Sequence, residues 1–218
     1  EAVVLAPQPE ALPLTVRLGI NGAQAIRDVL LASSETALAD QRRGDLTQAF
    51  RDVVEAIIAG GGMVGGALAL GLAQLGFTVT VIEKNAPPVF DASSPPDVRI
   101  SAISASSVGL LRGLGVWDSV RSMRAHAYRQ LETWEWESAH VVFNAAELRL
   151  PELGYMVENN VLQRALWQAL EAHERISLQV GTSLQEMRRE ETYASLTLTD
   201  GSQLDARLVV GEIGRAHV

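Results

Sequence analysis

The fold of this chain is decided by residues 53–65, which read VVEAIIAGGGMVG. The segment begins as a short apolar strand, passes through a glycine-rich turn and opens an apolar helix predicted over residues 63–75. A second strand, predicted over residues 78–83, follows the helix and ends in an acid, Glu83. A glycine motif of the form G-x-G-x-x-G is weak evidence alone, but between a strand and a helix, and before a strand with a terminal acid, it predicts dinucleotide binding.

Each glycine of the motif has a separate physical task. Gly60 allows the tight turn, Gly62 lets the backbone approach a pyrophosphate, and Gly65 lets the helix and the strand pack closely. The helix N-terminus offers free N–H groups and a partial positive charge to phosphates. Glu83 is placed to bind the ribose hydroxyls of an adenosine, and its charge would repel a 2′-phosphate. The pattern therefore predicts FAD or NAD rather than NADP, and the alternative is a glycine turn without a ligand.

A membrane span is the competing interpretation of the same region. Residues 56–82 carry no charge, and their length exceeds the roughly 20 residues that a span needs. They contain seven glycines, however, and end in the β-branched run TVTVI. A parallel strand and the helix that covers it are also apolar throughout. We therefore expect a buried strand–turn–helix–strand.

The composition narrows the partners and the site chemistry. The chain has 26 acidic and 18 basic residues and a net charge of −8, and its basic pairs are flanked by acids, so no nucleic-acid partner is predicted. There are no cysteines, which excludes disulfides and thiolate ligands. The four histidines show no metal-binding spacing. No metal site is therefore predicted.

Residues 1–52 differ in character from the rest of the chain. Prolines at positions 7, 9 and 13 indicate an irregular start, and possible capping boxes at Asn21 and Asp45 predict helices. The first methionine is Met63, inside the glycine turn. We interpret residues 1–52 as a partly helical extension of unknown origin, on a chain that is processed, truncated or joined to foreign sequence. We expect it to be dispensable for nucleotide binding and for thermal stability.

Beyond Glu83 the pattern predicts a mixed α/β domain without repeats. Residues 86–97 contain four prolines and are predicted to form a loop. Asp200-Gly201 predicts a tight hairpin turn. The remaining predicted elements are helices over 106–112, 116–123 and 159–173, a hairpin of 131–137 with 140–143, and strands over 176–180, 194–198 and 204–210.

Four stretches carry a family resemblance: 59–66 (AGGGMVGG), 97–104 (DVRISAIS), 131–137 (LETWEWE) and 154–159 (GYMVEN). Through them the chain resembles the flavoprotein monooxygenases related to para-hydroxybenzoate hydroxylase, from about residue 55 to residue 211. It is most similar to their ubiquinone-biosynthesis branch, in particular the bacterial demethoxyubiquinone hydroxylases. The resemblance implies the α/β class, with a Rossmann-like FAD/NAD(P)-binding fold interleaved with part of a β-rich substrate domain.

The resemblance also implies a function. Enzymes of this branch hydroxylate a polyprenylated benzoquinol with FAD as cofactor, NAD(P)H as electron donor and O₂ as oxidant. The polyprenyl tail implies a cytoplasmic protein that contacts the inner face of the membrane, or a ubiquinone-biosynthesis complex. Two alternatives stay open, an NAD(P)-dependent reductase and a non-catalytic nucleotide-binding fragment. No residue is a convincing catalytic base, so none is assigned.

Two further cofactor-binding residues follow from the resemblance. Arg99 corresponds to an arginine that these enzymes place beside the pyrophosphate and ribityl chain of FAD, and the alternative is a surface arginine. Asn159 corresponds to a polar residue that contacts the nucleotide from the start of a helix, and the alternative is a simple N-cap. Trp134 and Trp136 alternate on one face of a predicted strand and are expected to belong to the core rather than to a site.

The end of the chain departs from the family pattern. Where the family continues Gly-Ala-Asp-Gly, with an aspartate that binds the ribityl part of FAD, this chain reads Gly211-Glu212-Ile213-Gly214. We therefore interpret residues 53–211 as an incomplete FAD-binding monooxygenase domain and residues 212–218 as an artefactual tail. We expect the chain alone to be inactive as a hydroxylase.

Overall fold

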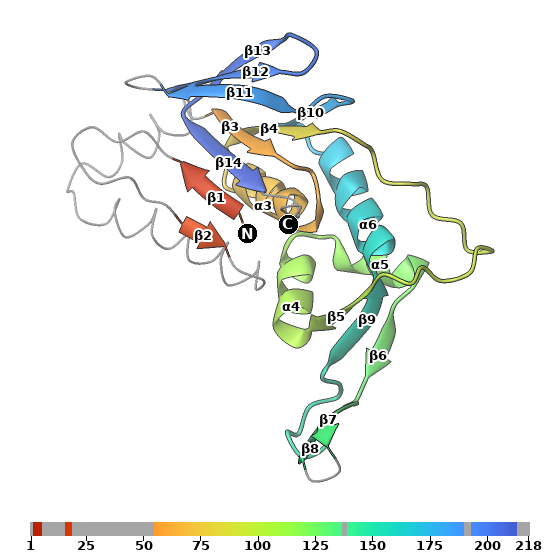
Figure 1. Cartoon of the computed structure of the whole chain (residues 1–218). Coiled ribbons are helices and arrows are strands. Elements are labelled where there is room, and N and C mark those ends of the chain that lie inside the picture. The colour runs from red at the N-terminus through yellow and green to blue at the C-terminus, as the bar shows by residue number, and fades with distance from the viewer. Residues whose placement is uncertain (1, 6–15, 19–54, 137–138, 190–192, 213–218) are drawn as a thin grey trace. The chain divides into compact units, whose positions relative to one another are not determined.

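A computed structural model describes residues 2–5, 16–18, 55–136, 139–189 and 193–212. The chain divides into two compact units, which are described separately here. The first unit joins residues 1–87 to residues 166–218, and the second consists of residues 88–165. The elements of both are labelled in Figure 1.

The first unit is built on a six-stranded sheet. Four neighbouring strands run parallel, and the strand beyond them, β1, pairs antiparallel with β14. The irregular start predicted from the prolines is wrong at residues 2–5 and 16–18, because both segments are strands. The helices predicted from Asn21 and Asp45 lie outside the described residues. In spatial order the strands are β10 (Ile176–Val180), β4 (Thr78–Glu83), β3 (Glu55–Ala59), β14 (Leu208–Glu212), β1 (Ala2–Leu5) and β2 (Val16–Leu18).

The predicted strand–turn–helix–strand is confirmed. Helix α3 (Met63–Gln74) connects β3 to β4, and its residues from Gly65 to Ala73 are all buried. The helix is apolar on every side because the sheet covers one flank and α6 residues Leu166 and Leu170 approach another. Across the described part of the chain, no helix is both long enough and apolar enough to cross a bilayer.

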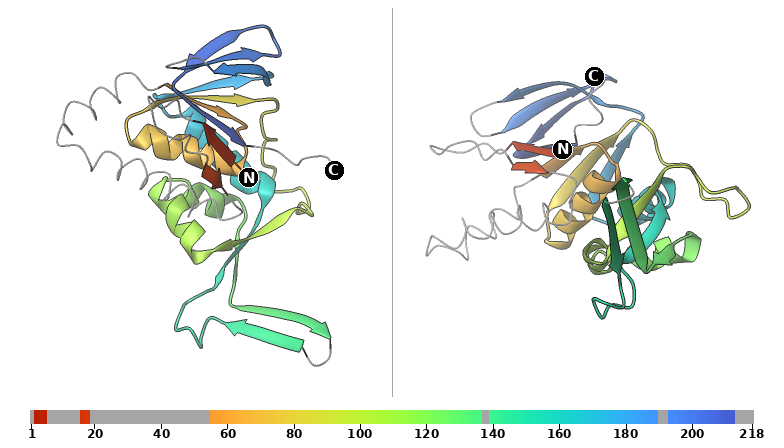
Figure 2. Two further views of the ribbon diagram at one scale, coloured as in Figure 1. Left: turned by 60° about the vertical axis from the view of Figure 1, so that its left-hand side comes forward. Right: turned by 60° about the horizontal axis from the view of Figure 1, so that its bottom comes forward.

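A three-stranded antiparallel sheet packs against the six-stranded sheet of the first unit, on the face opposite α3 (Figure 2). Its strands are β11 (Leu184–Arg189), β12 (Ala194–Leu198) and β13 (Gln203–Ala206). The hairpin turn predicted at Asp200-Gly201 joins β12 to β13, with Gly201 at φ 85°. One buried cluster unites the two sheets: Ile57, Ile82, Ala194, Leu196, Leu198, Ala206 and Val209.

One predicted strand of this unit is wrong. Residues 204–210 were predicted to form a single strand, but the chain leaves the small sheet at Ala206 and enters the parallel sheet at Leu208. The exposed Arg207 lies at the crossing, and the inward side chains of the two halves, Ala206 and Val209, fill the same core from opposite sheets. Glu212 continues β14 past the boundary proposed at residue 211, and residues 213–218 lie outside the described range.

The second unit contains a small antiparallel sheet, two short helices and a hairpin. The helices and the hairpin agree with the sequence-based predictions, as does the loop before β5, whereas β5, β6 and β9 were not predicted. The sheet has the order β5 (Ile100–Ser104), β9 (Gly154–Glu158), β6 (His126–Tyr128), the helices are α4 (Ala105–Gly113) and α5 (Trp117–Met123), and the hairpin is β7 (Gln130–Trp136) with β8 (Ala139–Asn144). Helix α6 (Asn159–Glu171) begins in this unit and ends in the first.

The expectation that the tryptophans of the hairpin belong to the core is wrong for Trp134, whose surface is 71% exposed. The hairpin β7–β8 forms a sheet of two strands, and its described residues from 130 to 135 and from 139 to 143 are all exposed. It extends away from α4 and α5 within its unit (Figures 1 and 2). A register shift between Trp134 and Trp136 also interrupts the alternation on which the prediction relied.

Candidate nucleotide-binding site

The glycine turn between β3 and α3 has the backbone that a phosphate-binding loop needs. Gly60 has φ 115°, a conformation that side chains disfavour, and its N–H donates to the Ile82 carbonyl at 2.9 Å. Gly62 is the N-cap of α3, and its carbonyl accepts the Gly66 N–H at 2.8 Å. The N–H groups of the first helical turn are not used inside the helix. They are therefore available to an anion at this end of α3.

Gly65 brings the helix against the turn. A Cβ atom at this position would collide with the carbonyl oxygen of Gly60 and would lie 3.1 Å from Cγ2 of Ile58. The close approach of helix and strand expected from the motif is therefore present, and only glycine fits it.

Glu83 ends β4 with its carboxylate held at the same turn. Its Oε2 accepts the N–H of Gly61 at 2.7 Å, and its Oε1 accepts the N–H of Asn85 at 3.1 Å. The side chain is half-buried. An ionised carboxylate has about four acceptor positions, so two backbone bonds leave capacity for the hydroxyls of a ribose.

The sequence analysis missed two residues that meet at this turn, Gly61 and Trp167. A Cβ at Gly61 would lie 3.1 Å from Cβ of Glu83 and 3.1 Å from Cζ3 of Trp167. Trp167 is buried, and its Nε1 donates to Oε1 of Glu171 at 2.8 Å. The indole of α6 thus packs directly on the middle glycine. The GGG run was a signal for Gly61, but nothing in the sequence indicates that a residue so distant along the chain covers it.

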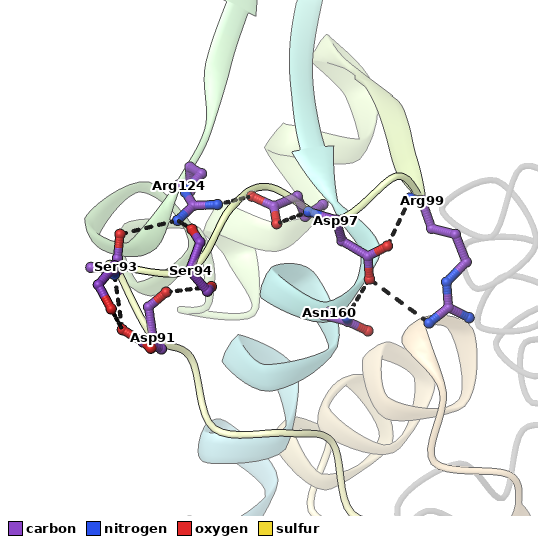
Figure 3. A network of polar contacts seen from close by, with 9 residues as sticks. Asp91, Ser93, Ser94, Asp97, Arg99, Arg124 and Asn160 are labelled. Carbon is purple, nitrogen blue, oxygen red and sulfur yellow. Dashed lines mark hydrogen bonds and ion pairs between the residues drawn. The ribbon is translucent and has the colours of Figure 1, made fainter.

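Arg99 and Asn159 lie together in the second unit. The N–H of Asn159 donates to the Arg99 carbonyl at 2.9 Å, and Oδ1 of Asn159 accepts the hydroxyl of Ser101 at 2.6 Å. The Arg99 side chain is 68% exposed, and its Nη2 is 3.8 Å from Oδ2 of Asp97 (Figure 3). The guanidinium is therefore an exposed cation next to the start of α6. The polar network around it, which includes Glu158 and Arg124, was not anticipated.

The predicted cofactor residues therefore fall into two groups, one in each unit. The first unit brings together Gly60, Gly62, Gly65 and Glu83, and the second brings together Arg99 and Asn159. The residues of the first group fit an adenine dinucleotide: a turn without side chains, a helix N-terminus and a carboxylate at the end of the second strand. Among the residues that the structure describes, no cluster of three or more potential metal ligands occurs.

These features define a dinucleotide-binding α/β protein of the Rossmann-like type. The chain belongs to the FAD binding domain family, which matches residues 53–215. This assignment selects FAD over NAD, a choice that the glycine motif alone left open.

Similarity to known proteins agrees with this family. The chain is 65% identical to 3-demethoxyubiquinol 3-hydroxylase of Escherichia coli (strain K12) over 160 residues, 73% of this chain and 41% of that protein. This identity confirms the resemblance to the ubiquinone-biosynthesis hydroxylases. The chain thus spans less than half the length of this relative. Among solved structures, p-nitrophenol 4-monooxygenase PnpA from Pseudomonas putida DLL-E4 has the same fold, with a TM-score of 0.53 and 18% identity over 73% of this chain and 39% of that one.

A second similarity points to a different protein. Hydroxycarboxylate dehydrogenase A of Escherichia coli (strain K12) is 82% identical to this chain over 66 residues, 30% of this chain and 18% of that protein. Together the aligned lengths of 160 and 66 residues exceed the 218 residues of the chain, so the two similarities overlap along it.

Proposed function

We propose that this chain carries the FAD-binding part of an enzyme that hydroxylates a polyprenylated benzoquinol in ubiquinone biosynthesis. The observation that carries the proposal is the 65% identity to 3-demethoxyubiquinol 3-hydroxylase over 160 residues. Its support in the structure is the glycine turn with Glu83 bound to the Gly61 N–H.

In this proposal the residues of the chain bind and orient the cofactor. Gly60, Gly62 and Gly65 let the backbone approach the pyrophosphate, which accepts hydrogen bonds from the N-terminal N–H groups of α3. The Glu83 carboxylate accepts hydrogen bonds from the adenosine ribose. Its charge disfavours a 2′-phosphate there, which is consistent with FAD.

We assign Arg99 and Asn159 to the same cofactor. A guanidinium beside a diphosphate forms charge-assisted bonds, and Arg99 is exposed enough to reach a ligand. Asn159, bonded to Ser101 and to the Arg99 carbonyl, holds an amide group at the start of α6. Support for both assignments comes from the family and from their adjacency in the second unit.

When bound, FAD supplies the redox and oxygen chemistry, and the protein positions it and excludes water. We propose NAD(P)H as the electron donor. The apolar tail of the substrate places the enzyme at the inner face of the cytoplasmic membrane, or within a ubiquinone-biosynthesis complex, as a peripheral protein.

The proposal is tested by comparing two proteins. One is the 218-residue chain, and the other continues it after Gly211 with the remaining sequence of the 3-demethoxyubiquinol 3-hydroxylase relative. Both receive FAD, NAD(P)H, O₂ and a short-chain demethoxyquinol. We expect hydroxylated product from the longer protein and none from the 218-residue chain, which then acts as a nucleotide-binding fragment. Absence of product from the longer protein, with FAD bound, would contradict the assigned reaction.

We propose a separate origin for residues 1–52. The family match begins at residue 53, and the 66-residue similarity to hydroxycarboxylate dehydrogenase A has the right length for the preceding part and the glycine turn. The chain would then join two unrelated sequences near residues 53–66. Amplification of the source DNA across this segment tests the junction: an intact product of the expected length contradicts an artificial join, and its absence supports one.

A further inference from the structure

The segment that carries Arg99 is fixed at a buried carboxylate. Glu158, the last residue of β9, is 8% exposed. Its Oε2 accepts the backbone N–H of Asp97 at 2.7 Å, and its Oε1 accepts Nη1 of Arg124 at 3.0 Å. One side chain thus joins the end of the loop between β4 and β5 to the C-cap of α5.

Arg124 extends this connection along the loop. Its Nη2 donates to the carbonyl oxygens of Ala92 at 3.3 Å and Ser94 at 3.0 Å, and Arg124 is labelled beside Ser94 in Figure 3. Its guanidinium carbon lies 5.3 Å from the ring centroid of Phe90. The loop also has local order of its own, since Asp91 accepts both the hydroxyl and the N–H of Ser93. These bonds lower the pKa of the Asp91 carboxyl. Arg124 therefore bonds a loop that has no helix or strand of its own.

Asp97 connects Glu158 to Arg99 through hydrogen bonds. Its Oδ1 accepts the Arg99 N–H at 3.0 Å, and its Oδ2 accepts Nδ2 of Asn160 at 2.5 Å (Figure 3). The Arg99 carbonyl in turn accepts the N–H of Asn159. Both backbone polar groups of Arg99 are therefore fixed, while its side chain stays 68% exposed. These bonds fix the backbone of Arg99, from which the side chain extends. The guanidinium can therefore leave Asp97 and bind another anion.

We propose that Glu158 and Arg124 are positioning residues that pre-organise Arg99 for an anionic diphosphate ligand. A buried ion pair is poor evidence for stability, because desolvation offsets the attraction between the charges. Here the Glu158 carboxylate and the Arg124 guanidinium each bond backbone groups of the loop between β4 and β5, which an apolar pair could not do. A loop already ordered before binding loses less entropy when the ligand arrives. The inference rests on the proposed function, because the diphosphate is taken to be that of FAD.

The test is a double-mutant cycle in the 218-residue chain. Glu158→Gln keeps the shape of the side chain and an acceptor but removes the charge that Arg124 binds. Glu186→Gln is the matched control, because Glu186 also pairs with an arginine, Arg188, at 2.9 Å, but on the exposed strand β11. We expect Glu158→Gln to weaken FAD binding about 10-fold, as for loss of one charged hydrogen bond, and Glu186→Gln to leave it unchanged.

The effect of Glu158→Gln on FAD affinity is also measured in a chain that carries Arg99→Ala. This comparison separates a positioning role of Glu158 from a merely structural one. If Glu158 acts through Arg99, Glu158→Gln causes no further loss of FAD affinity once Arg99 is alanine. An equal loss in both backgrounds, or no loss in either, overturns the proposal.

Amide hydrogen exchange gives a readout that needs no ligand. The amides of Asp97 and Asn159 should exchange faster in Glu158→Gln and at the parental rate in Glu186→Gln, while the Gly61 amide is unchanged in both. If the unsubstituted chain binds no FAD, the proposed function fails, and exchange alone decides the inference: unaltered protection of Asp97 and Asn159 in Glu158→Gln refutes it.

Discussion

Replacing Glu83 by glutamine and by alanine separates the two roles that the structure gives its carboxylate. The group orders the glycine turn by accepting the Gly61 N–H at 2.7 Å, and in the proposal it also binds the ribose. A hydrogen bond to a charged group contributes about 1.5–3 kcal/mol, so Glu83→Ala should weaken FAD binding about 10- to 150-fold. Glu83→Gln keeps a neutral acceptor, and it should therefore cost less.

The effect of the negative charge of Glu83 is measured with a second pair of ligands, 5′-AMP and adenosine 2′,5′-bisphosphate. Adenosine 2′,5′-bisphosphate places a phosphate where Glu83 is expected to meet the ribose, so the parental chain should prefer 5′-AMP. Glu83→Gln removes the like-charge repulsion and should narrow that preference. Calorimetric titration of FAD, 5′-AMP and the bisphosphate into each variant measures all three affinities. Glu186→Gln, an exposed acid on β11, is the control for net charge.

The assignment of Glu83 fails if Glu83→Ala binds FAD as tightly as the parental chain does. It also fails if Glu83→Gln loses FAD affinity but keeps the full preference for 5′-AMP. The first result would remove Glu83 from the site, and the second would reduce it to a residue that orders the turn.

Three further predictions follow from the first unit. Gly65→Ala should lower the free energy of unfolding by about 1–3 kcal/mol, because the added Cβ collides with the Gly60 carbonyl. Gly109→Ala in α4 should not lower it, because a Cβ there meets open space. Urea denaturation compares the two variants, and equal stabilities would contradict the packing argument. Trp167→Phe should loosen the turn at Gly61 and weaken FAD binding with the fold retained by circular dichroism; an unchanged affinity would show that the indole is only core. Deletion of residues 1–50 should preserve FAD affinity but lower the thermal midpoint, since β14 loses its partner β1 and becomes an open edge; a midpoint unchanged by calorimetry would support the sequence-based expectation instead.

Local patterns explain what the sequence could predict. The glycine turn, α3 and β4 are specified by residues adjacent in the chain: an apolar run, three glycines and a terminal acid. The hairpin β7–β8 was found for the same reason. The exposure of Trp134 was not, because alternation shows that two faces differ and does not show whether any layer covers them.

Long-range contacts explain what the sequence could not predict. Trp167 reaches Gly61 only because α6 packs beside α3, and Glu158 bonds Asp97 across 61 positions and Arg124 across 34. The division of residues 203–212 between two sheets was also hidden, because both halves are short and no turn signal separates them. Contacts between residues so far apart in the chain depend on how the helices and strands pack together. Local sequence patterns specify only neighbouring residues and do not specify that packing.

The most direct test of the account is a competition between FAD and NAD for the purified 218-residue chain. Flavin fluorescence follows FAD binding, and ADP and NAD are added as competitors. We predict saturable binding of one FAD per chain, displacement of the bound FAD by ADP, and a lower affinity of the chain for NAD than for FAD. Binding of NAD in preference to FAD, or no saturable FAD binding, would contradict the central claim that this chain is a flavin-binding domain.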